Sequence, residues 1–244
     1  DYASNLIDEN IKKADIVFLC TPVLQIVPMV EKILPYLKPD AILTDVGSTK
    51  GFIWSKLKQI LPHDIDYVAG HPMTGSEQSG IKAANAELFR NKGYILIPQT
   101  AKKEKSVKLV NELLKVTGAN ITTMGIEEHD AVAAVISHVP HVVAAGLVNI
   151  LGSAETDVDN KLKLAGGGFK DTTRIASSNS DMWADICISN ADNIIIELEK
   201  LQTEITGVIT DIKNNDRDNI YNYFYKAKCR RDKLIDAANR ILKK

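Results

Sequence analysis

The first half of the chain repeats one pattern, in which a short and nearly continuous apolar run is followed by a segment whose apolar residues recur at helical spacing. The apolar runs cover residues 14–20, 41–47, 66–70, 93–98 and 120–125. The helix-like segments between them cover residues 23–37, 49–61 and 102–118. Strands that are apolar on both faces and alternate with helices belong in a parallel sheet with helices on both sides. The pattern predicts a Rossmann-like α/β domain.

The character of the sequence changes near residue 125. No further strand is predicted beyond that point, and long helices are expected over residues 126–151, 181–212 and 215–243. A kink is expected at Pro140, because proline removes a backbone donor inside a helix. We therefore predict two domains: an α/β domain over residues 1–125 and an all-helical domain over residues 126–244.

Composition excludes several classes of partner. The chain has 244 residues, of which 45% are hydrophobic and 25% are charged, as in ordinary globular proteins. Its net charge of −1 creates no strong field toward nucleic acid or an anionic membrane. No apolar run approaches the roughly 18 residues that would span a bilayer. Three scattered cysteines without CxxC spacing indicate reduced thiols, as in a cytoplasmic protein. From the charge and the length of the apolar runs we expect no nucleic-acid or membrane partners.

Polar residues follow three successive predicted strands. Thr21 and Pro22 follow the first strand, and the second runs into Gly47, Ser48 and Lys50. The third runs into the stretch GHPMTGSEQSG, residues 70–80. In open α/β sheets, ligands bind outside the carboxyl ends of the strands. The placement predicts a site for a nucleotide or a small metabolite.

The stretch GHPMTGSEQSG is predicted to be a long loop, because three glycines and a proline leave little apolar surface to bury. It carries His71 and Glu77. A histidine has an ordinary pKa of about 6.5 and can therefore accept a proton near neutral pH. A lone histidine is more often structural than catalytic. The position of His71 directly after a strand favours a role as general acid or base.

The helical half carries a second group of polar residues. Ser137, His138 and His141 lie within one predicted helix, where positions three or four apart share a face. Two such histidines are compatible with zinc, but no third ligand and no HExxH spacing accompany them, so we expect no metal site. Farther along, AGGGFKDTTRIA contains Arg174, whose planar guanidinium suits a carboxylate; a lone arginine of this kind is also common in salt bridges.

Four motifs occur together in a fixed order: DVGSTKG, GHPMTGSEQSG, HDAVAAVISHVPH and GGGFKDTTRIA. In this combination the chain resembles the prephenate/arogenate dehydrogenases of tyrosine biosynthesis, over residues 14 to about 240. The resemblance implies an oxidoreductase that uses NAD or NADP to convert prephenate to 4-hydroxyphenylpyruvate and CO2; some members act on arogenate. It also implies a homodimer formed through the helical domain.

The resemblance assigns roles to individual residues. His71 resembles the catalytic base that takes the proton from the ring hydroxyl, and Ser48 resembles the residue that orients this hydroxyl. Glu77 resembles an acidic residue that shapes the pocket. The remaining implied substrate contacts are Ser137, His141 and Arg174, with Arg174 pairing with a carboxylate. The implied cofactor contacts are Thr21, Pro22, Gly47 and Ser48.

One family feature is absent from the sequence. The family begins with a strand, a GxGxxG turn and a helix that receive the cofactor pyrophosphate, and this chain contains no GxGxxG. It also starts at Asp1 and not at a methionine. We expect that about 45 to 50 N-terminal residues are missing, a length estimated from the usual size of a first βαβ unit. The chain alone is then expected to bind NAD weakly or not at all and to lack the first two strands of the sheet.

Alternatives to the dehydrogenase remain. A dimeric helical interaction module with a vestigial nucleotide-binding half would also explain the long apolar helices. A related hydroxy-acid dehydrogenase would place a catalytic lysine on the helix after the domain boundary, and residues 126–151 contain no lysine. The sequence does not discriminate prephenate from arogenate, or NAD from NADP.

Overall fold

The computed structural model describes residue 7 and residues 9–75, 84–152 and 163–241. By its internal contacts the chain divides into two compact units, Asp1–Ile194 and Ile195–Lys244. The site lies wholly within the first unit. The domain boundary predicted near residue 125 also falls inside this unit and stays a prediction.

The sheet of the first unit has five strands in the order β1-β2-β3-β4-β5. Their bounds are Ile16–Leu19, Ile42–Asp45, Asp66–Pro72, Gly93–Ile97 and Asn120–Thr123. Three of the pairs are parallel, but β4 runs antiparallel to β3. The prediction of a purely parallel sheet was therefore wrong at this pair. A parallel connection usually needs a helical crossover, and the glycine- and serine-rich sequence after β3 lacks the apolar spacing of one.

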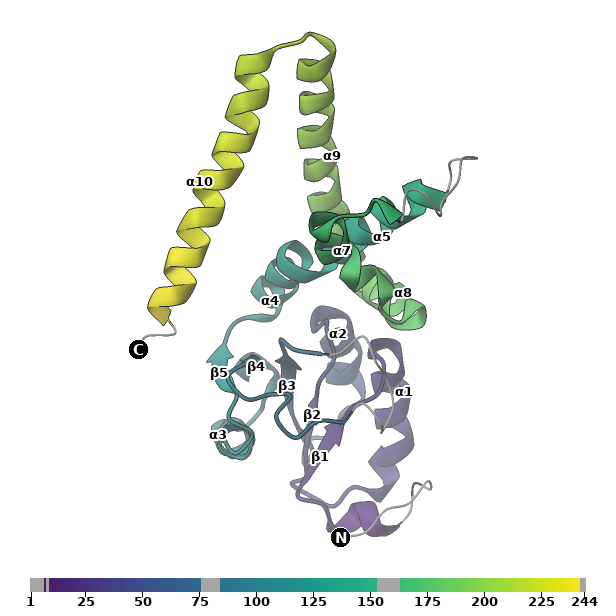
Figure 1. Cartoon of the computed structure of the whole chain (residues 1–244). Helices are drawn as coiled ribbons and strands as arrows, with labels where there is room; N and C mark the ends of the chain where they lie inside the picture. The colour runs from purple at the N-terminus through teal and green to yellow at the C-terminus, as the bar shows by residue number, and fades with distance from the viewer. Residues whose placement is uncertain (1–6, 8, 76–83, 153–162, 242–244) are drawn as a thin grey trace. The chain divides into compact units, whose positions relative to one another are not determined.

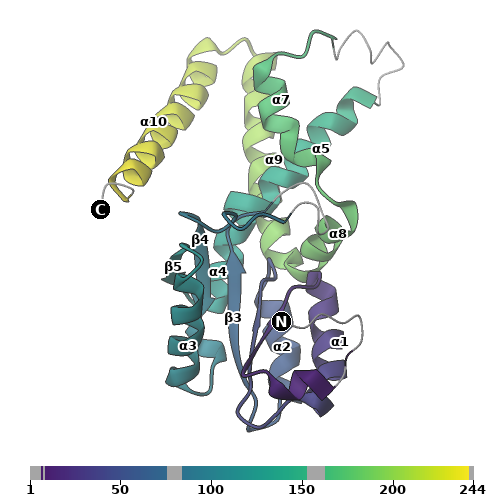
Figure 2. The same ribbon diagram turned by 60° about the horizontal axis from the view of Figure 1, so that its bottom comes forward.

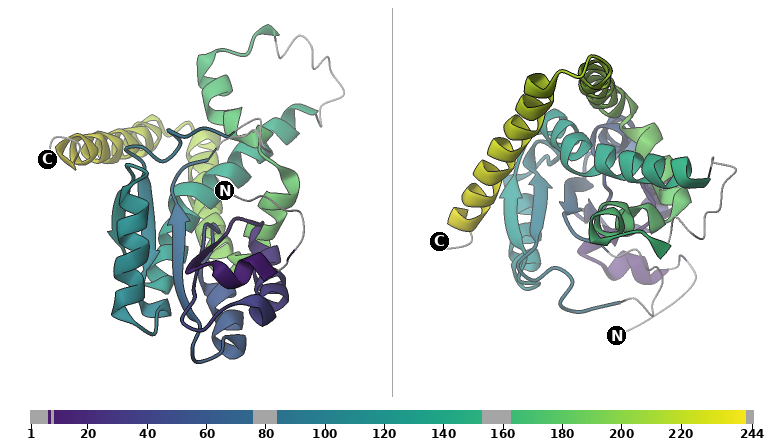
Figure 3. Two further views of the ribbon diagram at one scale, coloured as in Figure 1. Left: turned by 90° about the horizontal axis from the view of Figure 1, so that it is seen from below. Right: turned by 45° about the horizontal axis from the view of Figure 1, so that its top comes forward.

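Helices cover both faces of this sheet, as predicted (Figure 1). These helices are α1 (Val23–Ile33), α2 (Gly51–Ile60) and α3 (Glu104–Lys115). Alternate strand residues point to opposite faces, so Leu43 and Ala69 pack with α1 and α2, while Ile42 and Val68 pack with α3. Figure 3 shows α3 on one side of the strands and α1 on the other. The Rossmann-like architecture is thereby confirmed.

Three short 3₁₀ segments accompany these elements: η1 (Glu9–Lys13), η2 (Leu34–Tyr36) and η4 (Pro98–Thr100). The segment η2 continues directly from α1, so the helix predicted over residues 23–37 ends in a tighter turn. The other predicted strands and helices of this half are found within a few residues of their expected ends.

The first helical segment after the sheet changes its winding in the middle. It consists of α4 (Ile126–Ala133), the π-helical segment η5 (Ala134–His138) and α5 (Val139–Gly152). The predicted disturbance at Pro140 takes the form of this wider turn, in which Val139 N donates to Ala134 O, five residues earlier. Because Pro140 has no N–H to give to the preceding turn, the π segment absorbs the mismatch.

The remaining helices are α7 (Gly167–Thr173), the 3₁₀ segment η6 (Arg174–Ser177), α8 (Ser180–Ser189), α9 (Ala191–Lys213) and α10 (Arg217–Ile241). The single helix predicted over residues 181–212 is wrong, because the chain breaks at Asn190 between α8 and α9. Figure 2 shows α8 beside α1, and residues of both helices belong to the core under the sheet. α10 agrees with the helix predicted over residues 215–243.

The stretch Ile126–Leu151 is long and apolar enough to cross a membrane by length and composition, with a mean hydropathy of 1.8 and 22% of the window buried. The expectation that no segment approaches this length was therefore wrong, because a window average tolerates the polar residues between the apolar ones. This is weak evidence for a membrane, since core helices pass the same test. The same stretch carries buried polar residues of the site, including His129 and His138.

A buried ion pair fixes the ends of β2 and β3. Lys50 and Asp45 have no exposed side-chain surface, and Lys50 Nζ lies 2.5 Å from Asp45 Oδ2 and 2.7 Å from the carbonyl oxygen of Gly70. The other Asp45 oxygen accepts the Tyr67 hydroxyl at 2.8 Å and the Gly70 N–H at 3.2 Å. Gly47 N donates to Asp45 Oδ2 at 3.0 Å. Lys50 thus has a structural role inside the core.

We predict that Lys50→Met lowers the free energy of unfolding by about 3 to 5 kcal/mol, because it leaves the Asp45 charge buried without its cation. The measurement is urea denaturation. The matched control is Lys38→Met, which breaks the Lys38–Asp15 pair, where the side chains are 35% and 87% exposed. This exposed pair contributes at most about 1 kcal/mol. Equal losses for the two variants would contradict the structural role of Lys50.

Candidate active site

A cavity of about 690 Å³ lies where β1, β2 and β3 end, and helical residues close its other side. The sheet side contributes Ser48, which follows β2, and His71, which belongs to β3. The helical residues contribute Ser137, His141 and Arg174. Five residues predicted separately from two distant parts of the sequence thus line one cavity.

His71 lies on strand β3 and not on a loop, which corrects the prediction that the whole stretch of residues 70–80 is irregular. Its backbone pairs with Ile95 of β4, and its side chain is only 7% exposed. Burial, with smaller contributions from Lys50, His129 and His138, holds the pKa of His71 well below the ordinary value of a histidine. The imidazole is therefore neutral near pH 7 and can accept a proton.

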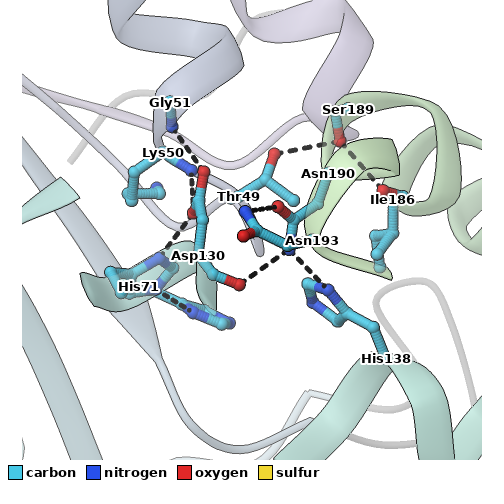
Figure 4. A network of polar contacts seen from close by, with 12 residues as sticks. Thr49, Lys50, Gly51, His71, Asp130, His138, Ile186, Ser189, Asn190 and Asn193 are labelled. Carbon is cyan, nitrogen blue, oxygen red and sulfur yellow. Dashed lines mark hydrogen bonds and ion pairs between the residues drawn. The ribbon is translucent and has the colours of Figure 1, made fainter. Parts of the chain in front are cut away.

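A line of hydrogen bonds connects His71 to Asp130 (Figure 4). His71 Nδ1 lies 2.8 Å from His129 Nε2, and His129 Nδ1 lies 2.7 Å from Asp130 Oδ1. The Asp130 carboxylate accepts the backbone N–H groups of Lys50 and Gly51, each at 2.8 Å. These two amides form the N-terminus of α2, where the helix dipole favours a negative charge. These hydrogen bonds hold the Asp130 carboxylate at the N-terminus of α2.

Asn190, at the break between α8 and α9, fixes the form of a second buried histidine. Its Nδ2 donates at 2.8 Å to the carbonyl oxygen of Asp130 and lies 3.1 Å from His138 Nδ1. A carbonyl oxygen only accepts, so the amide nitrogen faces both groups and His138 Nδ1 is an acceptor. Burial lowers the pKa of His138 to about 4. His138 is therefore a neutral imidazole with its hydrogen on Nε2.

His141 has a defined orientation at the wall of the cavity. Its ring stacks on Trp183 with 3.7 Å between ring centroids and an interplanar angle of 23°. Its Nδ1 lies 2.8 Å from the carbonyl oxygen of Ser137 and therefore donates to it. Burial lowers the pKa of His141. The neutral ring thus keeps Nε2 as an acceptor, which suits a donor group on a ligand better than a carboxylate.

The residues predicted to contact a cofactor lie at the ends of β1 and β2. The Thr21 hydroxyl is buried and has no hydrogen-bond partner among the residues that the structure describes, which is compatible with a polar ligand group at this point. Pro22 precedes the first turn of α1. A side chain on Gly47 would meet Asp45 Oδ2 and Ile26 Cδ1 at 2.9 Å. Internal packing thus already explains the glycine at position 47.

The structure leaves part of the predicted set apart from the cavity. Thr21, Pro22 and Gly47 are not among the residues that line it, and Lys50 is buried against Asp45. Glu77 lies outside the described residues. Among the residues that the structure describes, no group of three or more His, Cys, Asp or Glu side chains could hold a metal ion.

Sequence reasoning missed His129, Asp130 and Asn190. His129 was visible in the motif HDAVAAVISHVPH, and steps of four residues lead from it through Ala133 and Ser137 to His141. That spacing placed His129 on the same helix face as two predicted site residues. Asn190 carried no comparable signal, because its role depends on a helix break between two regular patterns.

Two family models match the chain. The model described as prephenate dehydrogenase, nucleotide-binding domain, matches residues 2–123, and the model described as prephenate dehydrogenase, dimerization domain, matches residues 126–226. The chain belongs to the prephenate dehydrogenase family. The family predicted from the four motifs is thereby confirmed.

Individual members of the prephenate dehydrogenase family are similar over nearly the whole chain. The prephenate dehydrogenase of Bacillus subtilis is 40% identical over 92% of this chain, which spans 61% of the length of that protein. The crystal structure of the A. aeolicus prephenate dehydrogenase, in complex with hydroxyphenyl propionate and NAD+, has a TM-score of 0.86 and 33% identity. It covers 95% of this chain, and 80% of that chain is covered in turn.

An arogenate dehydrogenase is also among the similar structures. The Synechocystis arogenate dehydrogenase has a TM-score of 0.78 and 29% identity, and the match covers 93% of this chain and 81% of that chain. The similarity therefore extends to relatives that are named for different substrates.

We predict that the free energy of unfolding falls as the pH is lowered from 6.5 toward 4. Unfolded histidines bind protons below about pH 6.5, while His71 and His138 stay neutral in the folded state, so protons favour unfolding. Each such histidine contributes up to about 1.4 kcal/mol per pH unit. Urea denaturation at several pH values measures the slope.

Two variants identify the source of this slope. His138→Asn keeps an oxygen that can accept from Asn190 but removes the titrating group, so the slope between pH 6.5 and 4 should become smaller. His63→Asn, at an exposed position, should leave the slope unchanged. An unfolding free energy that does not vary over this range in the unmodified chain would contradict the burial of neutral histidines.

Proposed function

We propose that this chain carries the active site of an NAD(P)-dependent dehydrogenase that oxidatively decarboxylates prephenate to 4-hydroxyphenylpyruvate in tyrosine biosynthesis. The strongest support is the placement of His71. It is a neutral imidazole at a strand end, it lines a cavity of about 690 Å³, and its Nδ1 is hydrogen-bonded to His129. These are the properties required of a general base.

In the proposed reaction, His71 takes the proton from the ring hydroxyl of the substrate. Ser48 lies on the same cavity wall and orients this hydroxyl toward the imidazole. Removal of the proton favours departure of hydride from the same carbon, and loss of CO2 makes the ring aromatic. Bound NAD(P)+ would accept the hydride. Because helical residues line the other side of the cavity, the substrate is held with its hydroxyl near the imidazole, which supplies catalysis by orientation.

The helical residues of the cavity bind the rest of the substrate in this proposal. Arg174 pairs with a carboxylate of the dianionic substrate, because its guanidinium can donate two parallel hydrogen bonds. His141 offers an acceptor in its neutral form, and Ser137 contributes its hydroxyl. Glu77, which lies outside the described residues, is proposed only from the resemblance to be the acidic residue of the substrate pocket. In this proposal Thr21, Pro22, Gly47 and Ser48 contact the cofactor. The Thr21 hydroxyl, which has no hydrogen-bond partner among the described residues, supports this.

The proposed enzyme is a cytoplasmic homodimer. Apolar side chains on the stretch 126–151 are exposed in the single chain: Val132, Val135, Ile136, Leu147, Val148 and Ile150. They lie in the region matched by the model named for dimerization. Burying such a surface in a second copy removes it from water. Sedimentation as a monomer at micromolar concentration would contradict this assembly.

The function is tested by reduced-cofactor formation with prephenate and with arogenate, each with NAD and with NADP. Because the chain spans 61% of the length of the B. subtilis relative, it is assayed alone and also joined to the N-terminal segment of that relative. Turnover in either form with prephenate supports the proposal, and a preference for arogenate would reassign the substrate. Absence of turnover in both folded forms would favour the non-catalytic helical module.

In whichever of these two forms is active, we predict that His71→Asn lowers turnover by about 100- to 10,000-fold, the usual contribution of a general base. The asparagine amide group takes the place of the histidine Nδ1, but asparagine has no basic nitrogen that can accept the proton. The Michaelis constant for the substrate should change little. Undiminished turnover would refute the assignment of the base.

A further inference from the structure

The pair His129–Asp130 is built into the core behind His71. His129 is fully buried and Asp130 is 5% exposed. Neither residue lines the cavity, so neither is placed to contact a substrate directly. The rings of His71 and His129 meet edge to face, with 5.0 Å between centroids and an interplanar angle of 66°. This geometry suits a hydrogen bond between ring nitrogens better than simple stacking.

The hydrogen-bond partners determine where the hydrogens lie. The Asp130 carboxylate receives backbone N–H groups on both oxygens, so it acts as an acceptor toward His129 as well. His129 Nδ1 therefore carries a hydrogen, and in the neutral ring His129 Nε2 is left as an acceptor. His71 Nδ1 must then donate to it across the 2.8 Å contact. The lone pair of His71 consequently lies on Nε2.

From this arrangement we propose that His129 and Asp130 are positioning residues for the proposed base, which orient the His71 lone pair and share its proton. This inference rests on the proposed function. When His71 Nε2 accepts a proton, its Nδ1 hydrogen can shift toward His129 Nε2. The positive charge then lies next to the Asp130 carboxylate. One proton enters at His71 Nε2, and the resulting charge is shared by His71, His129 and Asp130 alone.

The surroundings of His71 explain why such support is needed. Lys50 faces it from the start of α2, and His129 and His138 face it from α4 and the π segment. The Lys50 cation opposes a positive charge on His71, and burial opposes it further. Asp130 is the carboxylate that reaches His71 through a continuous hydrogen-bonded path. In this proposal Asp130 offsets part of this opposition through its hydrogen bond to His129.

The sequence keeps room for this carboxylate at Gly51. A Cβ atom on Gly51 would lie 2.9 Å from Asp130 Oδ2, too close for the carboxylate to stay. The absence of a side chain there lets Asp130 reach the amides that open α2. A purely apolar contact between α4 and α2 would not require this approach. The glycine thus fits the close approach of Asp130 to the N-terminus of α2.

The test compares His129→Gln with His129→Leu in the active form of the enzyme. Glutamine can still accept from His71 Nδ1 but cannot take up a proton, whereas leucine can do neither. We expect turnover to fall about 10- to 100-fold in the glutamine variant and further in the leucine variant, with the Michaelis constant within about twofold. The matched control is Glu127→Gln, an exposed carboxylate on the same helix, which should leave both constants unchanged.

Two further measurements separate positioning from a structural role. Imidazole ¹⁵N NMR of the folded chain should show His71 with its hydrogen on Nδ1, and this form should persist in His129→Gln and be lost in His129→Leu. The acid limb of the kcat/KM profile should move to lower pH in the leucine variant, because protonated His71 loses its acceptor. If the leucine variant does not fold, the glutamine variant decides by turnover.

Three outcomes discriminate among the possibilities. His71 with its hydrogen on Nε2 in the unmodified chain would overturn the proposal, and so would unchanged turnover in His129→Gln. The expected NMR form without turnover on any substrate would contradict the proposed function but support the orientation of the His71 lone pair. The NMR measurement needs no substrate, so the two failures remain distinguishable.

Discussion

The Asp130 carboxylate holds together the two kinds of structure that make up the site. It belongs to the first helix after the sheet, yet it accepts the two backbone amides that open α2. Unpaired amides at a helix start need acceptors, and the helix dipole makes a carboxylate a favourable one. This contact places His129 against His71 and brings the π segment over the strand ends. A cavity walled by both structures depends on it.

The Asp45–Lys50 pair performs the corresponding task within the sheet. Four donors converge on the Asp45 carboxylate, and Lys50 also binds the carbonyl oxygen of Gly70, the residue before His71. A buried ion pair is weak evidence for net stability, because both charges lose their hydration. Its clearer consequence is geometric, since it fixes the backbone from which His71 projects. The same cation also contributes to keeping His71 neutral.

The sequence predicted what depends on local pattern and missed what depends on distant pairing. The strands were recognisable because both of their faces are buried, and Ser48 and His71 because polar residues follow apolar strands. The reversed direction of β4 depends on which edge of β3 remains open, and no local pattern records this. Lys50 looked like a ligand-binding residue because it follows a strand end, and the motif DVGSTKG does not show that its side chain turns back to Asp45, five residues earlier. The π segment and the break at Asn190 were hidden inside regular helical spacing.

The buried environment of His71 has two opposite effects on a general base. Burial and a nearby cation keep His71 unprotonated, so that it is ready to accept a proton, but they also make it a weaker acceptor. A general base works best when its pKa lies near the operating pH. In the proposed mechanism the line from His71 through His129 to Asp130 reconciles the two effects. The carboxylate stabilises a positive charge once a proton arrives, while the cavity itself contains no carboxylate among its described lining residues that would compete with an anionic substrate.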